Sequence, residues 1–587
     1  MSRAQGLCRH GYILLFAALA AAAVTAPTQA RADDAAIQER IANHLAFGEF
    51  GPARALAASL EGPAARDRIF AEIARTQAMV GARRASVSTA SGIADDRARG
   101  GLLGEIGSMP YGGGARGGAA IADFDSLIEL ITSTVGAGTW EEPDGGPSTI
   151  EEFRGGVYVD ASGVMRRMEI AVDDGTLGTL RRDAAVADEN RDVLRTTPLR
   201  MVSLNRLEKQ AQLRAALGLP PDETMANLAG LHKIQYVFVY PETGDIVLAG
   251  PAGAWRENAE GRTVNVETGR PVLQLDDLVV LLRNAYADEG RFGCSITPRR
   301  ENLERTQAFV KESTGSPLKS RAQRVAWLRE LRETLGKQDI TVDGIDPRTR
   351  VARVIVEADY HMKRIGMGLE DGTVDVKSYL ASITPGPDGS LPPMDVLRWW
   401  FTLNYDAVTA TDGRDAFAIN GIGAQVLSEN EMLTERGERV HTGKSEELNR
   451  EFARSFTKSF EALAVKYPVY AELQNVFDLA LAAALIRSED LPGQVSWHMT
   501  HFGPAQQSDG LVYEVALGEA PKEVDSIIND RDVGRNGIVV GVSGGVSVDT
   551  QQLVRSDAIE KDRYGLLPAQ RTGSTPKDLP ADAWWWD

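Results

Sequence analysis

The sequence has few cysteines, few aromatic residues and a deficit of positive charge. Only two of its 587 residues are cysteines, so a fold held together by a framework of disulfides is excluded. Lys and Arg number 64 against 82 Asp and Glu, and a chain with this formal charge of −18 lacks the basic surface that binds nucleic acid. The hydrophobic share of 43% and the charged share of 25% are those of an ordinary globular protein. The length corresponds to about three or four folding units.

Long apolar runs are also scarce, and the clearest one lies near the N-terminus. Arg3 and Arg9 precede an apolar stretch at 12–26, and the small-residue motif Ala30-Arg31-Ala32 follows it. A positive segment, a short apolar core and an A-x-A site together predict a secretory signal peptide over residues 1–32. The stretch is shorter than the about 20 residues that a membrane-spanning helix needs. No Arg-Arg pair precedes it, which favours the general secretory route.

Removal of this segment would change the properties of the chain. Cleavage after Ala32 would take the formal charge from −18 to −21, because the segment carries three arginines and no acid. Cys294 would remain as the single cysteine, and we expect it to be a small buried hydrophobic residue. We therefore expect a protein of the periplasm or the cell surface, stabilised by packing and with no transmembrane span once the signal is removed.

Changes in composition divide the rest of the chain into several parts. Residues 33–108 have apolar residues at helical spacing and a self-similarity of about 30 residues, which predicts a helical segment similar to tetratricopeptide repeats. Residues 109–120 are rich in glycine and predict a linker. Residues 121–170 are typical of a small α+β module, in which a strand at 156–160 pairs with one at 164–170. The charged residues 171–200 indicate a second linker.

Residues 201–554 have the mixed pattern of a large α+β domain with an antiparallel sheet. The spacing predicts a hairpin within 234–249 and an antiparallel meander within 400–429. The strands occur in hairpins rather than in regular βαβ units, which places the whole multidomain chain in the α+β class. The apolar run at 479–486 is too short to cross a membrane and predicts a buried helix.

Residues 555–587 contain few apolar side chains until Trp584, Trp585 and Trp586. This pattern predicts a disordered tail that ends in a tryptophan cluster. Three exposed indoles would be costly in water, so they either fold back onto the core or bind a partner's groove or a membrane interface. The sequence leaves both alternatives open.

Three segments of the large domain carry a resemblance to a known family. They are EADYHMKRIGMG at 357–368, YPVYAELQNVFDLAL at 467–481 and VSGGV at 542–546. Over residues 200–550 the chain resembles planctomycete exported proteins that carry a domain of unknown function. The resemblance implies export and a common fold, and it brings no established activity and no catalytic residues.

The candidate catalytic residues form no complete motif. Ser543 lies in a G-x-S-x-G pattern, but no histidine follows it in the chain, as the hydrolases with this pattern require. Glu357 and His361 are four residues apart on an expected helix and are candidates for a general acid and base. An ion pair on the helix face is the simpler interpretation of that cluster.

A second pair, His498 and His501, is the candidate metal site. Two imidazoles at this spacing could share a metal on one face of a helix, but in a strand they would point to opposite faces. The glutamate of the H-E-x-x-H motif is missing, so packed or solvated histidines are the favoured interpretation and no metal or other cofactor is expected.

The preferred hypothesis is an exported cell-envelope protein with a non-catalytic structural or interaction role. Its expected partner is a protein or a component of the envelope, and nucleic acid is excluded by the charge. The alternative is a secreted hydrolase that uses the histidine and glutamate side chains of the large domain.

Overall fold

The structure is a computed structural model that describes residues 37–45, 49–60, 62–109, 149–153, 156–160, 191–313, 320–384, 396–433, 439–505, 510–533, 536–572 and 575–587. The expected signal peptide, residues 110–120 of the first expected linker and residues 171–190 of the second lie outside these residues. Residues 191–200 of the second expected linker form a 3-10 turn (Arg191–Leu194) and the start of the strand Thr197–Ser203, so the linker prediction is wrong there. The chain divides into two compact units, residues 1–181 with 216–218, and residues 182–215 with 219–587. Each unit is described by itself.

The described part of the smaller unit is mainly helical, as predicted. Its labelled helices are α2 (Phe50–Ala58), α3 (Pro63–Met79), α4 (Arg83–Ala90) and α5 (Asp96–Ser108). Asp67 on α3 is buried and accepts hydrogen bonds from the backbone amides of Ala94 and Asp95, which fixes the turn before α5. Gly51 lies in the first turn of α2, whereas Gly81 follows α3 with φ of 82°. The two glycines are not structurally equivalent, and the resemblance to tetratricopeptide repeats stays a prediction.

The small α+β module contains one described strand pair. β2 (Gly156–Asp160) forms as predicted, but it pairs with the preceding β1 (Thr149–Phe153). Phe153 lies opposite Gly156, so only two residues connect the strands. A two-residue connection is the commonest way to join two antiparallel strands, and it makes β1 the nearest partner for β2 along the chain. The expected partner at 164–170 lies outside the described residues.

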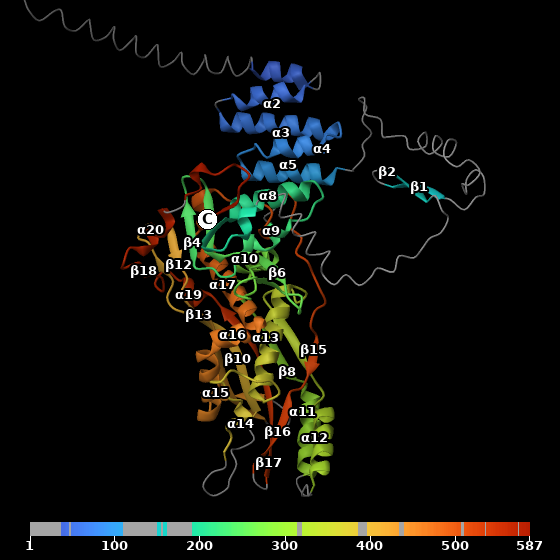
Figure 1. The fold of residues 1–587 in the computed structure, drawn as a ribbon, viewed down its shortest axis with the longest axis vertical. Coiled ribbons are helices and arrows are strands. Elements are labelled where there is room, and N and C mark those ends of the chain that lie inside the picture. Colours follow the sequence, from blue (N-terminus) through green and yellow to red (C-terminus); the bar gives the residue numbers. More distant parts are fainter. Residues whose placement is uncertain are drawn as a thin grey trace, which may run out of the picture. The chain divides into compact units, whose positions relative to one another are not determined.

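The larger unit contains an eight-stranded sheet, which is antiparallel except where β10 and β17 pair in parallel. Its order is β14 (Arg439–His441), β13 (Gly421–Leu433), β10 (Val396–Tyr405), β17 (Asn536–Asp549), β8 (Arg291–Pro298), β9 (Lys337–Asp343) and β15 (Glu523–Asp525), with β16 (Ile528–Val533) also paired to β17. The predicted meander is therefore only partly correct. β10 and β13 do pair, but the strands between them leave this sheet and join a second one (Figure 1).

The second sheet of the larger unit has seven strands. Its order is β18 (Glu560–Lys561), β11 (Thr409–Ala410), β12 (Ala416–Ala418), β4 (Tyr236–Tyr240), β5 (Asp245–Ala252), β3 (Thr197–Ser203) and β19 (Trp585–Trp586). The predicted hairpin is confirmed as β4 and β5, which pair in register from Tyr236 with Ala249 to Tyr240 with Asp245. A separate pair is formed by β6 (Trp255–Glu257) and β7 (Thr263–Asn265).

The prediction of a disordered C-terminal tail is wrong for the described residues. The segment supplies both edge strands of the seven-stranded sheet, β18 and β19, and also contains α20 (Leu566–Thr572). Edge strands offer unpaired backbone groups, so a polar segment of low hydrophobicity can still be ordered by the ladder it completes. The tail is fixed by backbone pairing rather than by a core of its own.

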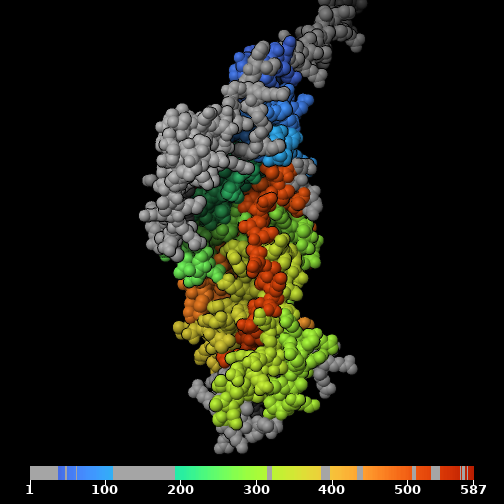
Figure 2. Space-filling model, turned by 90° about the vertical axis from the view of Figure 1, so that its right-hand side faces the viewer, coloured from blue at the N-terminus to red at the C-terminus, as the bar shows by residue number. Residues whose placement is uncertain are grey.

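The helices of the larger unit fill the space between and beside the sheets. They are α8 (Leu204–Ala216), α9 (Glu223–Ala226), α10 (Leu275–Ala287), α11 (Arg300–Ser313), α12 (Arg321–Leu335), α13 (Arg350–Gly366), α14 (Tyr379–Ser382), α15 (Glu447–Lys458), α16 (Phe460–Lys466), α17 (Pro468–Ser488), α18 (Leu491–Val495) and α19 (Gln551–Val554). Figure 2 shows residues near 510–525, in orange-red, as a band across one side of this unit, and 511–522 belong to no helix or strand.

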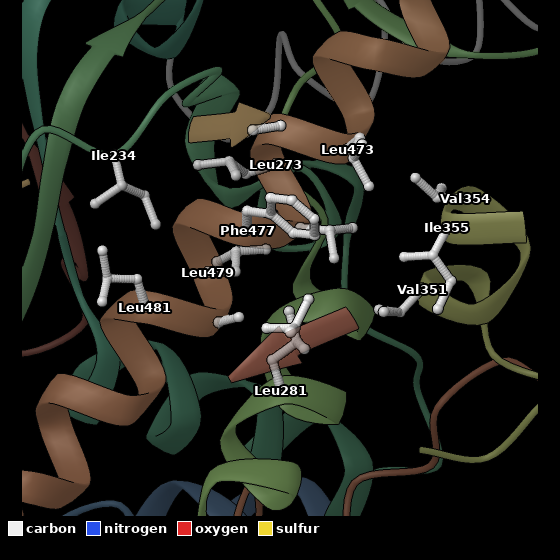
Figure 3. Close-up of a cluster of buried hydrophobic side chains, with 14 of the residues drawn as sticks. Ile234, Leu273, Leu281, Val351, Val354, Ile355, Leu473, Phe477, Leu479 and Leu481 are labelled. Carbon is white, nitrogen blue, oxygen red and sulfur yellow. The ribbon is translucent and has the colours of Figure 1, made fainter. Parts of the chain in front are cut away.

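Helix α17 is the centre of the hydrophobic core. Every residue from Val469 to Ile486 is buried, and the helix packs between α10 and α13. Figure 3 shows Phe477 and Leu479 of α17 facing Leu281 of α10 and Ile355 of α13. Among the described residues this helix alone is long and apolar enough to cross a membrane by length and composition, and the same properties belong to a core helix. Its complete burial confirms the expected buried helix at 479–486.

Candidate functional site

The eight-stranded sheet has one covered face and one open face. Helices α13, α15 and α17 pack on the covered face, where Trp399 and Phe401 of β10 are fully buried. The side chains of Arg398 and Trp400 alternate with them and remain partly exposed on the opposite face. The register continues this open face across β17 and β8, where Ser547 and Asp549 lie exposed beside Arg291. The open face is therefore polar, and the covered face behind it carries buried aromatic side chains.

A groove of about 760 Å³ runs over this open face. Its floor includes the backbone of Gly293, Gly544 and Gly545. A Cβ atom on Gly544 would lie 1.6 Å from the carbonyl oxygen of Trp399, and one on Gly545 would lie 1.9 Å from that of Cys294. Glycine is therefore required at both positions so that the neighbouring strands can pair, and the floor of the groove is bare backbone.

The walls of the groove are polar and mostly acidic. Arg398 lies over the ring of Trp400, with 4.4 Å between the guanidinium carbon and the ring centroid. The other charged lining residues are one arginine and four acids, namely Arg291, Asp288, Glu289, Asp343 and Asp549. The groove thus combines an aromatic platform with an excess of negative charge, which favours a polar partner that carries positive charge.

A buried ion pair lies beneath the glycine floor, on the covered face. Asp359 and Lys363 of α13 are both fully buried, and their charged atoms are 2.5 Å apart. Burial raises the pKa of the Asp359 carboxyl, and the neighbouring Lys363 ammonium opposes this rise only in part. Burial also raises the pKa of the Cys294 thiol well above its usual range, so this cysteine is a buried and unreactive residue, as expected.

A cluster of two carboxylates and one imidazole lies beside the groove. Glu429 and Glu431 of β13 and His441 of β14 bring one potential ligand atom each to within 4.8 Å of the others. Arg398 connects the cluster to the groove, because its guanidinium is 3.2 Å from Glu429 while it stacks on Trp400. Within the described residues, this cluster is the group of side chains with the composition and spacing to hold a metal ion.

Ser543 is not the nucleophile of a hydrolase elbow. It lies in the middle of β17 rather than at a strand-to-helix turn, and it is fully buried. Its hydroxyl is 3.3 Å from the Glu431 carboxylate and 3.4 Å from the carbonyl of Leu397. The glycine-rich pattern around it reflects the close strand pairing described above.

Glu357 and His361 lie on α13 as predicted, but each is engaged by a different partner. Glu357 forms an ion pair with Arg262, which also binds the buried Glu472. The Nδ1 atom of His361 is 2.8 Å from the hydroxyl of Tyr470, and burial lowers the pKa of this imidazole. The contact with Arg262 fits the ion-pair interpretation of Glu357. None of these contacts joins Glu357 to His361, so they do not make the two side chains an acid–base pair.

His498 and His501 lie in the turn after α18, outside any helix or strand. Between them Met499 has φ of 49°, so the two imidazoles do not follow helical spacing. His501 is buried, its Nδ1 atom is 2.5 Å from the carbonyl of Leu511, and burial lowers its pKa to about 4. This environment keeps His501 neutral and packed. Among the described residues, the group of side chains with the spacing to hold a metal ion includes neither His498 nor His501.

The three C-terminal tryptophans fold back onto the core. Trp585 and Trp586 pair with Val202 and Met201, and Trp584 and Trp586 are 6% and 7% exposed. Arg200 is fully buried, lies over the ring of Trp585 and binds the side chain of Asp587 at 2.7 Å. The structure therefore has the tryptophans folded back rather than as a free anchor. Backbone pairing with β3 and the ion pair between Arg200 and Asp587 hold them against the core.

Sequence reasoning missed the residues that the open face brings together. Glu429 and Glu431 are two apart in a strand and must share a face, which was a readable signal. The contribution of Arg398, His441 and the two glycines depends on which strands pair, and β10 and β17 are more than 130 residues apart. No pattern within one segment of the sequence indicates that these two strands pair.

One comparison with known proteins finds a match. Residues 294–379 match a family described as "Protein of unknown function (DUF1598)". The match runs from β8 through α11, α12, β9 and α13 to the start of α14, so it includes the Asp359–Lys363 pair but not Arg398, Trp400 or the paired glycines of β17. It confirms a domain of unknown function within the large domain, over a shorter range than the resemblance suggested. Searches of curated proteins and of solved structures found no match.

Proposed function

We propose that this protein is an exported, non-catalytic interaction protein of the cell envelope, and that the groove on the open sheet face binds its partner. The signal-like pattern of residues 1–32 supports export. The groove supports binding, because its volume of about 760 Å³ lies in the usual range of ligand sites.

The observation that carries the proposal is the composition of the groove. A floor of bare glycine backbone allows a partner to approach the sheet closely, and Trp400 offers an aromatic surface at one side. The lining holds four carboxylates against two arginines. The best-fitting partner is therefore a polar protein segment or envelope polymer that carries positive charge.

Capture from an envelope fraction tests the binding part of the proposal. The chain without residues 1–32 would be immobilised, and the retained species compared with those held by Trp400→Ala. A partner of the groove should be lost in this variant and retained by Thr402→Ala, a change on the same face of β10 but outside the groove lining. If Trp400→Ala retains every species that the unaltered chain retains, the groove is not the binding site.

Export is tested separately by the N-terminus of the secreted protein. Expression of the full chain in a Gram-negative host should place it in the periplasm or the medium, with Asp33 as the first residue. Recovery of an uncleaved chain in the cytoplasm would contradict export without affecting the groove.

A further inference from the structure

The carboxylate–histidine cluster beside the groove is built on paired strands. Glu429 and Glu431 project from β13 toward the same face, and His441 of β14 is the register partner of Glu431. Arg398 of β10 is likewise the register partner of Glu429. The four side chains are thus positioned by rigid ladder pairing rather than by a loop, which is the setting in which ligand geometry is most precise.

The distances match a single ion. The Nδ1 atom of His441 is 3.2 Å from Oε2 of Glu429 and 3.1 Å from Oε1 of Glu431. Ligand atoms bound tetrahedrally at about 2.0–2.1 Å from a zinc ion are separated from each other by about 3.3 Å. The two carboxylate oxygens lie within 4.8 Å of each other, so one ion could bind all three atoms once the carboxylates close around it.

The outer carboxylate oxygens are already held by other donors. The backbone amide of Gly443 donates to Oε1 of Glu429 at 2.7 Å. The Ser543 hydroxyl is 3.3 Å from Oε2 of Glu431. Such outer contacts orient ligating carboxylates in metal sites. Here Oε2 of Glu429 and Oε1 of Glu431 face both the imidazole and the Arg398 guanidinium.

Two adjacent carboxylates are buried at this site. Glu429 and Glu431 are only 6% and 1% exposed, and burying two adjacent carboxylates is costly unless both charges are compensated. Arg398 supplies one positive charge, at 3.2 Å from Glu429 and 3.9 Å from Glu431. A divalent cation between the two carboxylates would add to the positive charge that Arg398 provides.

We propose that Glu429, Glu431 and His441 form a binding site for a divalent transition-metal ion of the zinc type. One imidazole nitrogen and two carboxylate oxygens suit Zn²⁺, whereas Ca²⁺ and Mg²⁺ prefer sites made of oxygen alone. The side chain of His441 is 62% exposed, so the ion has a path from solvent and keeps a position open for water. A bound metal would share Oε2 of Glu429 with Arg398, which lies 3.2 Å from that atom and also stacks on Trp400. The site does not depend on what the groove binds.

The test uses the full chain without residues 1–32, stripped with a chelator and then titrated with Zn²⁺ by calorimetry. One equivalent is expected to bind, and elemental analysis after dialysis should find the same stoichiometry. His441→Ala and Glu431→Gln should each weaken binding at least tenfold. His441→Ala is the cleaner variant, because its mostly exposed side chain can be removed without opening the core.

Two controls distinguish this site from others. His498→Ala removes the histidine that the sequence suggested, and it should leave the affinity unchanged. Co²⁺ should give visible absorption bands of a tetrahedral centre in the unaltered chain and not in His441→Ala. Absence of stoichiometric Zn²⁺ binding, or binding that survives in folded His441→Ala and Glu431→Gln, would overturn the proposal.

Discussion

Trp399 and Trp400 are neighbours in the same strand, yet they belong to opposite sides of the molecule's main sheet. The indole of Trp399 is fully buried, contacts the ring of Phe452 at a centroid distance of 4.3 Å and donates a hydrogen bond to Asn449. The indole of Trp400 borders the groove beneath Arg398. The covered face contributes fully buried aromatic side chains to the core, and the open face presents polar side chains to the groove. The pair shows that strand alternation alone places neighbouring side chains on a buried face and on a partly exposed face.

The largest loss in the free energy of unfolding is expected at Gly544, where β17 pairs closely with β10 between the two faces of the sheet. In Gly544→Ala the new Cβ would lie 1.6 Å from the Trp399 carbonyl oxygen, so β10 and β17 would have to separate. We expect a loss of more than about 4 kcal/mol, enough to prevent folding of the larger unit. Gly413→Ala is the control, because its Cβ would meet no atom closer than 3.6 Å. Circular dichroism and urea unfolding measure both, and a stably folded Gly544→Ala would contradict the described pairing.

Trp399→Ala tests the covered face directly. The change removes a fully buried indole and leaves the Asn449 side-chain oxygen without its donor. The expected loss in the free energy of unfolding is about 5 kcal/mol, from the cavity and the unsatisfied amide together. Trp400→Ala, one residue away, should cost about 1 kcal/mol because its side chain is already partly in water. Equal losses in the free energy of unfolding of the two variants would show that the two faces contribute equally to stability.

Lys363→Ala should have a slightly smaller effect on the covered face. It leaves the Asp359 carboxylate buried without its counter-ion, and breaking such a pair costs about 4 kcal/mol. The double variant Asp359→Asn with Lys363→Met removes both charges while nearly preserving shape, and it should recover most of that loss. Urea unfolding of the three proteins provides the comparison. A double variant no more stable than Lys363→Ala would mean that packing, rather than charge, sets the cost.

Parts of the fold were predictable because their partners are close in the sequence. The β4–β5 hairpin has its strands joined by a few residues, and α17 begins at Pro468, where proline is favoured at the first position of a helix. The meander was only half right, since β11 and β12 pair with β18 and β4, far away in the chain. The tail was wrong for the same reason, since β19 pairs with β3 more than 380 residues earlier.

The candidate site shows the same division at the level of single residues. The spacing of Glu429 and Glu431 requires a shared face once a strand is assumed. Nothing near Glu357 indicates that Arg262 would bind it, and nothing near His361 indicates Tyr470. A cluster of titratable residues in the sequence was therefore divided among separate partners. By contrast, Arg398 of β10 joined Glu429, Glu431 and His441 of the β13–β14 hairpin in a cluster that the sequence analysis did not identify.

The sequence by itself determined the acidic character of the chain, its mixed class, the buried helix and the β4–β5 hairpin. These properties follow from composition, from periods of two and 3.6 residues and from short connections, which operate within one element or between neighbouring ones. Only the tertiary structure decided that the tryptophan tail completes a sheet, that two glycines form the floor of a groove, and that Arg398 joins Glu429 beside that groove. The reason is physical, because backbone pairing and burial act between elements whose distance along the chain leaves no local trace.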